Sequence, residues 1–141
     1  MTTVAYNHKD KEIAVDSRFS RGDIISTDNG IKVFKEKGVT FVCAGFASDY
    51  DKIIEMWFDM ESKGQLMCSA FVVDNGIVYE FGLDYDGVIS KDALSENLCK
   101  GSGEFWAMAA MDFGCSAKDA VKYAMTRDMH TGGKIRVIKV K

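Results

Sequence analysis

The sequence predicts an α+β fold whose sheets are largely antiparallel. Runs typical of strands come first, followed by one helix, further strands, two helices and a final strand. This order lacks the regular strand-helix alternation that a parallel sheet requires. The 141 residues match the size of one domain, and a chain of this length buries roughly two thirds of its unfolded surface. We therefore expect residues 1–141 to form a single domain.

Five strands are expected in the first third of the chain. They are rich in β-branched residues and span residues 3–6, 12–16, 24–27, 31–35 and 38–45. The polar stretch 7–11 joins the first two as a hairpin. Asp28-Asn29-Gly30 is expected to join the third and fourth, because Asn-Gly supplies two residues that accept a positive φ. The polar segment 17–23 would connect the two hairpins.

An amphipathic helix is expected over residues 48–62. Ile53, Trp57 and Met60 recur at spacings of three and four residues and would share one face. Gly64 follows as the residue that ends the helical pattern.

The second half of the chain contains further strands and two more helices. A second Asp-Asn-Gly sequence, at 74–76, predicts another hairpin turn. Ser116 followed by Asp119 is a helix-capping pattern, and Gly132-Gly133 separates the last helix from the last strand. The expected strands span 67–73, 77–81, 87–89 and 134–140, and the expected helices span 104–113 and 116–127.

The composition argues against several classes of function. A net charge of −3 provides no basic field for nucleic acid. The four cysteines contain no Cys-x-x-Cys pair, and His8 and His130 lie near opposite ends of the chain, so neither a metal site nor a cofactor is signalled. No basic segment precedes an apolar core at the N-terminus, and no apolar run is long enough for a membrane span. We expect a cytoplasmic protein.

The N-terminal sequence Met1-Thr2-Thr3 contains a candidate nucleophile. An aminopeptidase removes an initiator methionine that precedes a small residue, and this would leave Thr2 with a free α-amine beside its own hydroxyl. Such an amine titrates near about 7.7–8.0 and accepts the hydroxyl proton. The alternative is a threonine with no catalytic role, as in most proteins that begin Met-Thr.

Several motifs, taken in order, resemble those of proteasome β-subunits and the bacterial heat-shock-locus V peptidase. These proteins are N-terminal-nucleophile hydrolases, and the resemblance covers nearly the whole chain. It implies a four-layer αββα sandwich with antiparallel sheets. The motifs are Thr2-Thr3-Val4, Ile13-Ala14-Val15-Asp16-Ser17-Arg18, Lys32-Val33, Ala44-Gly45-Phe46-Ala47-Ser48-Asp49, Gly101-Ser102-Gly103 and Asp128-Met129-His130-Thr131-Gly132-Gly133.

The resemblance implies a role for each matching residue. Thr2 would be the nucleophile, and Lys32, sixteen residues after Asp16, would be the catalytic lysine that Asp16 supports. The backbone N–H of Gly45 would stabilise the tetrahedral intermediate.

A further set of residues would surround the terminal amine of Thr2. By resemblance, Ser102, Asp128 and Thr131 form this hydrogen-bonding shell. Thr131 stands where the family has a serine, and the change preserves the hydroxyl.

The chain also departs from the family pattern. Too few residues separate Gly64 from Met67 for the second helix of one outer layer, so we expect that layer to contain a single helix. Trp57, Phe58 and Met60 would then pack in the core, with contact to another subunit as the alternative. Phe46 replaces a residue that is usually small and would reshape the substrate cleft.

The resemblance implies a threonine endopeptidase that cleaves peptides or unfolded proteins, assembles as a homo-oligomer and has an unfolding ATPase as a candidate partner. Two alternatives remain open at this level. A chain that keeps Met1 would be a catalytically silent assembly or binding subunit. The same nucleophile would also serve hydrolysis of a small amide.

Overall fold

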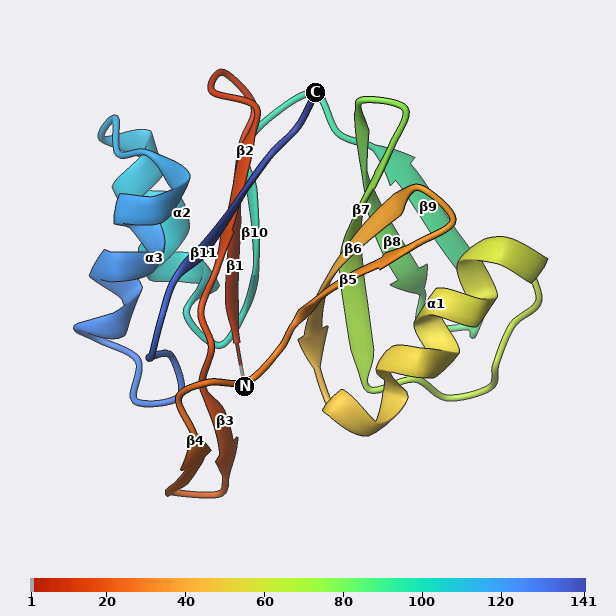
Figure 1. The fold of residues 1–141 in the computed structure, drawn as a ribbon, viewed down its shortest axis with the longest axis horizontal. Helices are drawn as coiled ribbons and strands as arrows, with labels where there is room; N and C mark the ends of the chain where they lie inside the picture. Colours follow the sequence, from red (N-terminus) through yellow and green to blue (C-terminus); the bar gives the residue numbers. More distant parts are fainter. Residues whose placement is uncertain (1) are drawn as a thin grey trace.

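The computed structural model describes residues 2–141, and the expected removal of Met1 lies outside the described residues. The fold has four layers: one helix, a five-stranded sheet, a four-stranded sheet and a pair of helices (Figure 1). The predicted αββα sandwich, with one outer layer reduced to a single helix, is confirmed for this part of the chain.

Every strand pairing is antiparallel, as the sequence predicts. The four-stranded sheet has the spatial order β10 (Leu98–Gly101), β1 (Thr3–Asn7), β2 (Glu12–Val15) and β11 (Arg136–Lys139). The five-stranded sheet has the order β5 (Val33–Glu36), β6 (Val39–Gly45), β7 (Cys68–Asp74), β8 (Ile77–Leu83) and β9 (Ile89–Ala93). A separate two-stranded ribbon contains β3 (Phe19–Arg21) and β4 (Ile24–Thr27).

The helices cover the two outer faces of the sandwich (Figure 1). On the five-stranded sheet lies α1 (Tyr50–Asp59), which a 3-10 turn at Ala47–Asp49 precedes. On the four-stranded sheet lie α2 (Glu104–Asp112) and α3 (Ala117–Met125). Ser116 caps α3 by accepting a hydrogen bond from the Asp119 N–H at 3.1 Å, as its spacing predicts. None of the helices in residues 2–141 has the length and hydropathy to cross a membrane.

Three hydrophobic clusters fill the three spaces between the layers. Adjacent strand residues point to opposite faces, so Phe41 of β6 packs toward α1 while Val42 packs between the sheets. In β1, Val4 lies between the sheets and Ala5 faces α2 and α3. The cluster under these two helices is rich in alanine, which allows them to approach the sheet closely.

Aromatic side chains cover the sheet face beneath the single outer helix. The Trp57 ring lies 6.3 Å from Phe41, 5.3 Å from Tyr79 and 5.0 Å from Phe81 between centroids. The Lys91 ammonium lies 4.2 Å from the Trp57 ring centroid in a cation–π contact. Trp57 is therefore a core residue, as predicted, and large rings take the place of helical cover.

The predicted helix over residues 48–62 is too long at its C-terminal end. It ends at Asp59 because Met60 adopts a left-handed conformation with φ 55° and donates its N–H to the Met56 carbonyl. The predicted core position of Met60 is therefore wrong, and its side chain is 49% exposed. Phe58 packs partly buried against the cluster beneath the helix.

The predicted hairpin between residues 24–27 and 31–35 is also wrong. Instead, β4 pairs with β3 and β5 pairs with β6. The segment between β4 and β5 contacts the residues that follow β2 instead of forming a turn. Asp28 forms an ion pair with Arg18, and the Gly30 N–H donates to the Ser17 carbonyl. The segment 17–23, predicted as a connection, contains β3.

The remaining turns and strands follow the sequence more closely, except that the strand predicted over residues 87–89 begins only at Ile89, as β9 (Ile89–Ala93). Asn75 and Gly76 have φ values of 50° and 76° and form the predicted turn between β7 and β8. β10 was not expected, because its four residues, Leu98–Gly101, are too few to show a strand period.

We expect Trp57→Ala to lower the free energy of unfolding by about 3–5 kcal/mol, because it removes a buried ring from the thinned layer. Tyr85→Ala is the matched control, since the Tyr85 ring is fully exposed, and its effect should stay within about 0.5 kcal/mol. Urea denaturation of both variants measures the difference. Equal losses would contradict the role given to Trp57.

Candidate active site

The predicted site residues meet where the two sheets approach each other at one end of the sandwich. Thr2 precedes β1, Asp16 follows β2, Lys32 precedes β5 and Gly45 ends β6. The start of β1 and the end of β6 lie at the same end of the two sheets (Figure 1). Strand ends from both sheets therefore supply the polar groups of one site.

A buried lysine links Thr2 to Asp16. The Lys32 ammonium donates to the Thr2 hydroxyl oxygen at 2.9 Å and to Asp16 Oδ1 at 2.8 Å. Lys32 and Asp16 are fully buried, and Thr2 is 1% exposed. Since the dielectric constant is low in such a site, the ammonium acts strongly on the Thr2 oxygen.

Backbone groups satisfy the rest of the Asp16 carboxylate. Oδ1 also accepts from the Thr3 N–H at 3.2 Å, and Oδ2 accepts from the N–H groups of Gly132 at 3.0 Å and Arg18 at 3.4 Å. These donors stabilise the ionised carboxylate, and they fix its position relative to Lys32.

Burial and charge pairing act in opposite directions on the two ionisable groups. Burial lowers the pKa of Lys32 from its usual range, while the charge of Asp16 and the hydrogen bond to it oppose this shift. Burial raises the pKa of Asp16, against the opposing effects of Lys32 and of the Gly132 and Thr3 backbones. The lysine therefore releases its proton more readily than an exposed lysine does.

A second polar network lies on the other side of Thr2 and Thr3. Asp128 Oδ2 accepts from the hydroxyls of Ser102 and Thr131, both at 2.5 Å. The Thr131 oxygen is 2.6 Å from the Thr3 hydroxyl oxygen, and the Ser102 hydroxyl donates to the Thr2 carbonyl at 3.5 Å. The structure thus brings the three residues of the predicted shell together beside the start of β1.

Hydrogen bonds hold Asp128 in its ionised form. Burial acts to raise the pKa of Asp128, but hydrogen bonds from Ser102, Thr131 and the His130 N–H outweigh it and set the pKa below its usual range. Since Thr131 donates to this carboxylate, Thr3 is the donor in the hydrogen bond between the two threonines.

The Gly-Ser-Gly sequence allows close contact with the N-terminal segment. A Cβ on Gly101, which has φ +100°, would lie 1.7 Å from the Thr2 carbonyl oxygen. A side chain at this position would displace Thr2, so the absence of one is required for the site.

Gly45 also occupies a position that excludes a side chain. Its φ of +113° is unfavourable for other residues, and a Cβ would lie 2.3 Å from the Met67 carbonyl oxygen. Gly45 and Thr2 line one cavity of about 260 Å³. The predicted nucleophile and the predicted oxyanion residue therefore face the same space.

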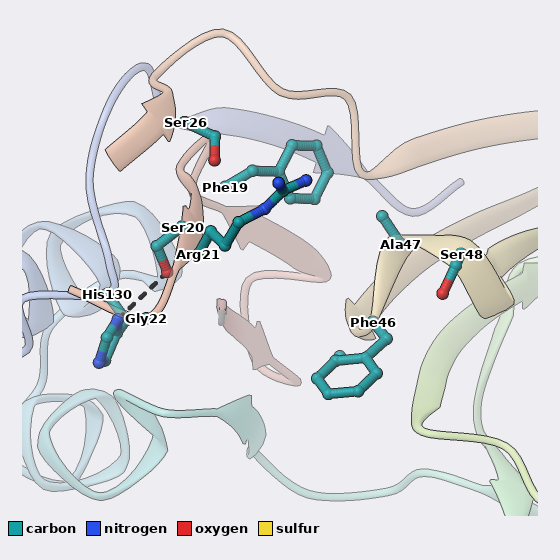
Figure 2. A pocket seen from close by; sticks show the side chains of 10 residues that line it. Phe19, Ser20, Arg21, Gly22, Ser26, Phe46, Ala47, Ser48 and His130 are labelled. Atoms are coloured by element: carbon teal, nitrogen blue, oxygen red, sulfur yellow. Dashed lines mark hydrogen bonds between the residues drawn. The ribbon is translucent and has the colours of Figure 1, made fainter. Parts of the chain in front are cut away.

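A second, larger cavity of about 660 Å³ adjoins Gly45. Ser20, Arg21 and His130 line it together with Phe46, which is 55% exposed (Figure 2). Phe46 thus forms part of a cavity wall.

Sequence reasoning missed two aromatic residues beside Lys32 and Thr2, namely Phe19 and Tyr50. The Phe19 ring centroid lies 5.1 Å from the Lys32 ammonium, and Phe19 packs against Tyr50 with 6.3 Å between ring centroids. Burial raises the pKa of Tyr50, and a hydrogen bond with the Thr2 side chain opposes this shift. Neither residue has a sequence signal beyond being aromatic, because their contacts join distant segments.

The structure holds no cluster of three or more potential metal ligands within residues 2–141. The four cysteines are free. Burial raises the pKa of Cys68 and of Cys99 to about 12, so both remain thiols at neutral pH.

Solved structures share this fold, among them the following two. Eukaryotic HslV from Trypanosoma brucei matches with a TM-score of 0.73 and 17% identity, over 97% of this chain and 98% of that chain. Thiobacillus denitrificans BPH in complex with epoxomicin matches with a TM-score of 0.72 and 16% identity, over 99% of this chain and 100% of that chain. No protein-family model and no curated protein matches the sequence. The fold implied by the sequence resemblance is confirmed.

We expect Thr131→Val to lower the free energy of unfolding by about 1–3 kcal/mol, because Thr3 and Asp128 each lose a buried hydrogen-bond partner. Thr131→Ser is the control: it keeps the hydroxyl and removes one methyl group, so its loss should be about 1 kcal/mol or less. Urea denaturation at neutral pH compares the two variants. A serine variant as unstable as the valine variant would contradict the importance of the hydroxyl.

Proposed function

We propose that this chain is a threonine endopeptidase whose nucleophile is the hydroxyl of Thr2, exposed by removal of Met1. The observation that carries the proposal is the buried chain of contacts from Asp16 through Lys32 to the Thr2 oxygen, at 2.8 Å and 2.9 Å. A threonine hydroxyl needs activation at neutral pH, and a buried ammonium at this distance supplies electrostatic stabilisation to the oxygen as it loses its proton.

The α-amine of Thr2 and the side-chain amine of Lys32 have separate roles in the proposed reaction. The α-amine of Thr2, as the free base, takes the hydroxyl proton while the oxygen attacks the peptide carbonyl. Lys32 keeps its proton and stabilises the negative charge on the oxygen. The α-ammonium then protonates the leaving amine, and water hydrolyses the resulting ester on Thr2 with the same amine as base.

Two further groups complete the proposed site. The Gly45 N–H stabilises the oxyanion of the tetrahedral intermediate, since Gly45 lines the same cavity as Thr2. Ser102, Asp128 and Thr131 orient the α-amine, because their network contacts the Thr2 carbonyl and the Thr3 hydroxyl. We therefore assign Ser102, Asp128 and Thr131 as positioning groups. Thr2, Lys32 and the Gly45 N–H are the catalytic groups.

The fold neighbours and the surface support further proposals about context. We propose peptides or unfolded proteins as substrates, a homo-oligomeric state, a cytoplasmic location and docking of an unfolding ATPase. For the oligomer, support comes from the exposed rings of Phe105 and Phe113 at the two ends of α2, which are 79% and 93% exposed. Burial of these rings against another copy of the chain would remove apolar surface from water, which favours association. Native mass spectrometry determines the assembly.

We expect Met1-free protein to hydrolyse fluorogenic peptides, and Thr2→Val to lower the rate by at least about 1,000-fold, because valine keeps the shape and the α-amine but lacks the nucleophilic oxygen. Thr2→Ser is the matched control and should retain activity. Intact mass measurement establishes that Met1 is absent from each preparation. Equal rates for the valine variant and the Met1-free protein would overturn the proposal, and a Met1 that persists in the cellular protein would favour a silent subunit.

We expect a bell-shaped pH dependence of kcat/KM. The rate should rise with pH as the α-amine loses its proton near about 7.7–8.0. It should fall again as pH rises through the lowered pKa of Lys32, at a value below the usual lysine pKa of about 10.4, because the neutral amine no longer stabilises the Thr2 oxygen. Circular dichroism at each pH controls for unfolding. A rate that stays constant beyond pH 10.4 would contradict this role of Lys32.

A further inference from the structure

We propose that the larger cavity selects substrates with an acidic side chain beside the scissile bond, and that Arg21 and His130 recognise its carboxylate. This inference rests on the proposed peptidase function, because that function places a peptide across Thr2. It assigns a substrate class to the site from the charges that line one cavity.

The two cavities adjoin each other at Gly45. Gly45 lines both the cavity of about 260 Å³ that contains Thr2 and the cavity of about 660 Å³ beside it. A peptide carbonyl held between Thr2 and the Gly45 N–H would therefore have an adjacent residue at the mouth of the larger cavity. The volume is sufficient for a complete side chain and part of the neighbouring backbone.

The ionisable side chains that line the larger cavity are basic. Arg21 and His130 are the ionisable residues among the described residues that line the larger cavity, and no carboxylate lines it. None of the ion pairs between residues 2–141 includes Arg21. Its guanidinium therefore remains available for a bidentate interaction with a carboxylate of the substrate.

Three of the nearby carboxylates are held by donors of their own, and a fourth, Asp23, is exposed in the turn after Arg21 and does not line the cavity. Asp28 is paired with Arg18, and Asp128 accepts from Ser102 and Thr131. Asp49, at the start of α1, accepts from the Met67 N–H at 2.8 Å. Asp49 also lies 3.6 Å from the Lys52 ammonium, so Asp28 and Asp49 each have a cationic partner. The charge of Asp128 acts on the neighbouring His130, which leaves Arg21 as the main positive group of the cavity.

The Ser20–His130 pair and the Phe46 ring lie on opposite sides of the larger cavity. The Ser20 hydroxyl lies 3.1 Å from His130 Nδ1, which fixes the imidazole and leaves Nε2 as its other hydrogen-bonding atom. Figure 2 shows Ser20 and His130 on one side of the cavity and Phe46, Ala47 and Ser48 on the other. The half-exposed Phe46 ring supplies an apolar wall for the methylene groups of a glutamate side chain.

Binding to an inactive variant tests the inference separately from catalysis. The probes are two fluorescent peptides that differ only in glutamate or glutamine at the residue before the scissile bond, and the protein is Thr2→Val without Met1. Fluorescence anisotropy should give a Kd at least about fivefold lower for the glutamate peptide at low salt. Adding Arg21→Gln should remove this preference.

Lys9→Gln in the same background is the matched control, because it removes one positive charge from the exposed turn between β1 and β2. It should leave the preference unchanged. His130→Gln should reduce the preference without removing it, since Arg21 remains. Equal Kd values for the two peptides, or no binding of either, would overturn the inference.

The peptide-binding experiment and the cleavage experiment can give opposite answers, so the two proposals are tested separately. A glutamate preference that depends on Arg21, in a protein that cleaves no peptide when Thr2 is present, would support the cavity assignment and contradict the proposed catalysis. Cleavage of both peptides at equal kcat/KM would support catalysis and contradict the assignment.

Discussion

The buried ion pair between Lys32 and Asp16 constrains most of the structure around the site. Removing one member of such a pair leaves an unpaired charge in a dry interior and costs about 3–5 kcal/mol. The pair is therefore stable only while both residues and the backbone donors to Asp16 keep their positions. These donors, Thr3, Arg18 and Gly132, come from three separate segments, so one carboxylate holds together the start of the chain, the segment after β2 and the segment before β11.

This constraint explains the unexpected course of the chain between β4 and β5. A hairpin over residues 24–35 would place Lys32 inside a strand ladder with its neighbours. In the structure, the Arg18–Asp28 ion pair and the hydrogen bond from Gly30 to Ser17 hold the segment beside the residues that follow β2. Lys32 precedes β5 and reaches Thr2, while its carbonyl accepts from the Cys43 N–H of β6. Placement of the lysine thus takes precedence over a local turn preference.

The outer faces of the two sheets are covered by different kinds of side chain. Small residues such as Ala5 and Ala14 let α2 and α3 pack closely on the four-stranded sheet. On the five-stranded sheet, Trp57 and its aromatic neighbours fill the space above the strands beneath a single helix. The shortened chain therefore keeps both sheet faces covered, and the geometry of the strand ends that carry the site does not require a second outer helix.

The sequence by itself determined most of the strands and the three helices, and the resemblance of its motifs to a known family indicated the layer order and the residues of the candidate site. Hydrophobic period and turn residues are local properties, and motifs such as Asp16-Ser17-Arg18 lie within a few residues. Tertiary structure alone decided the strand partners of β4 and β5 and the exposure of Met60. It also decided which contacts Phe19, Tyr50 and His130 make around the site. These features depend on segments that are distant in the chain, because a hydrogen bond or ring contact between such segments leaves no periodic signal in the sequence.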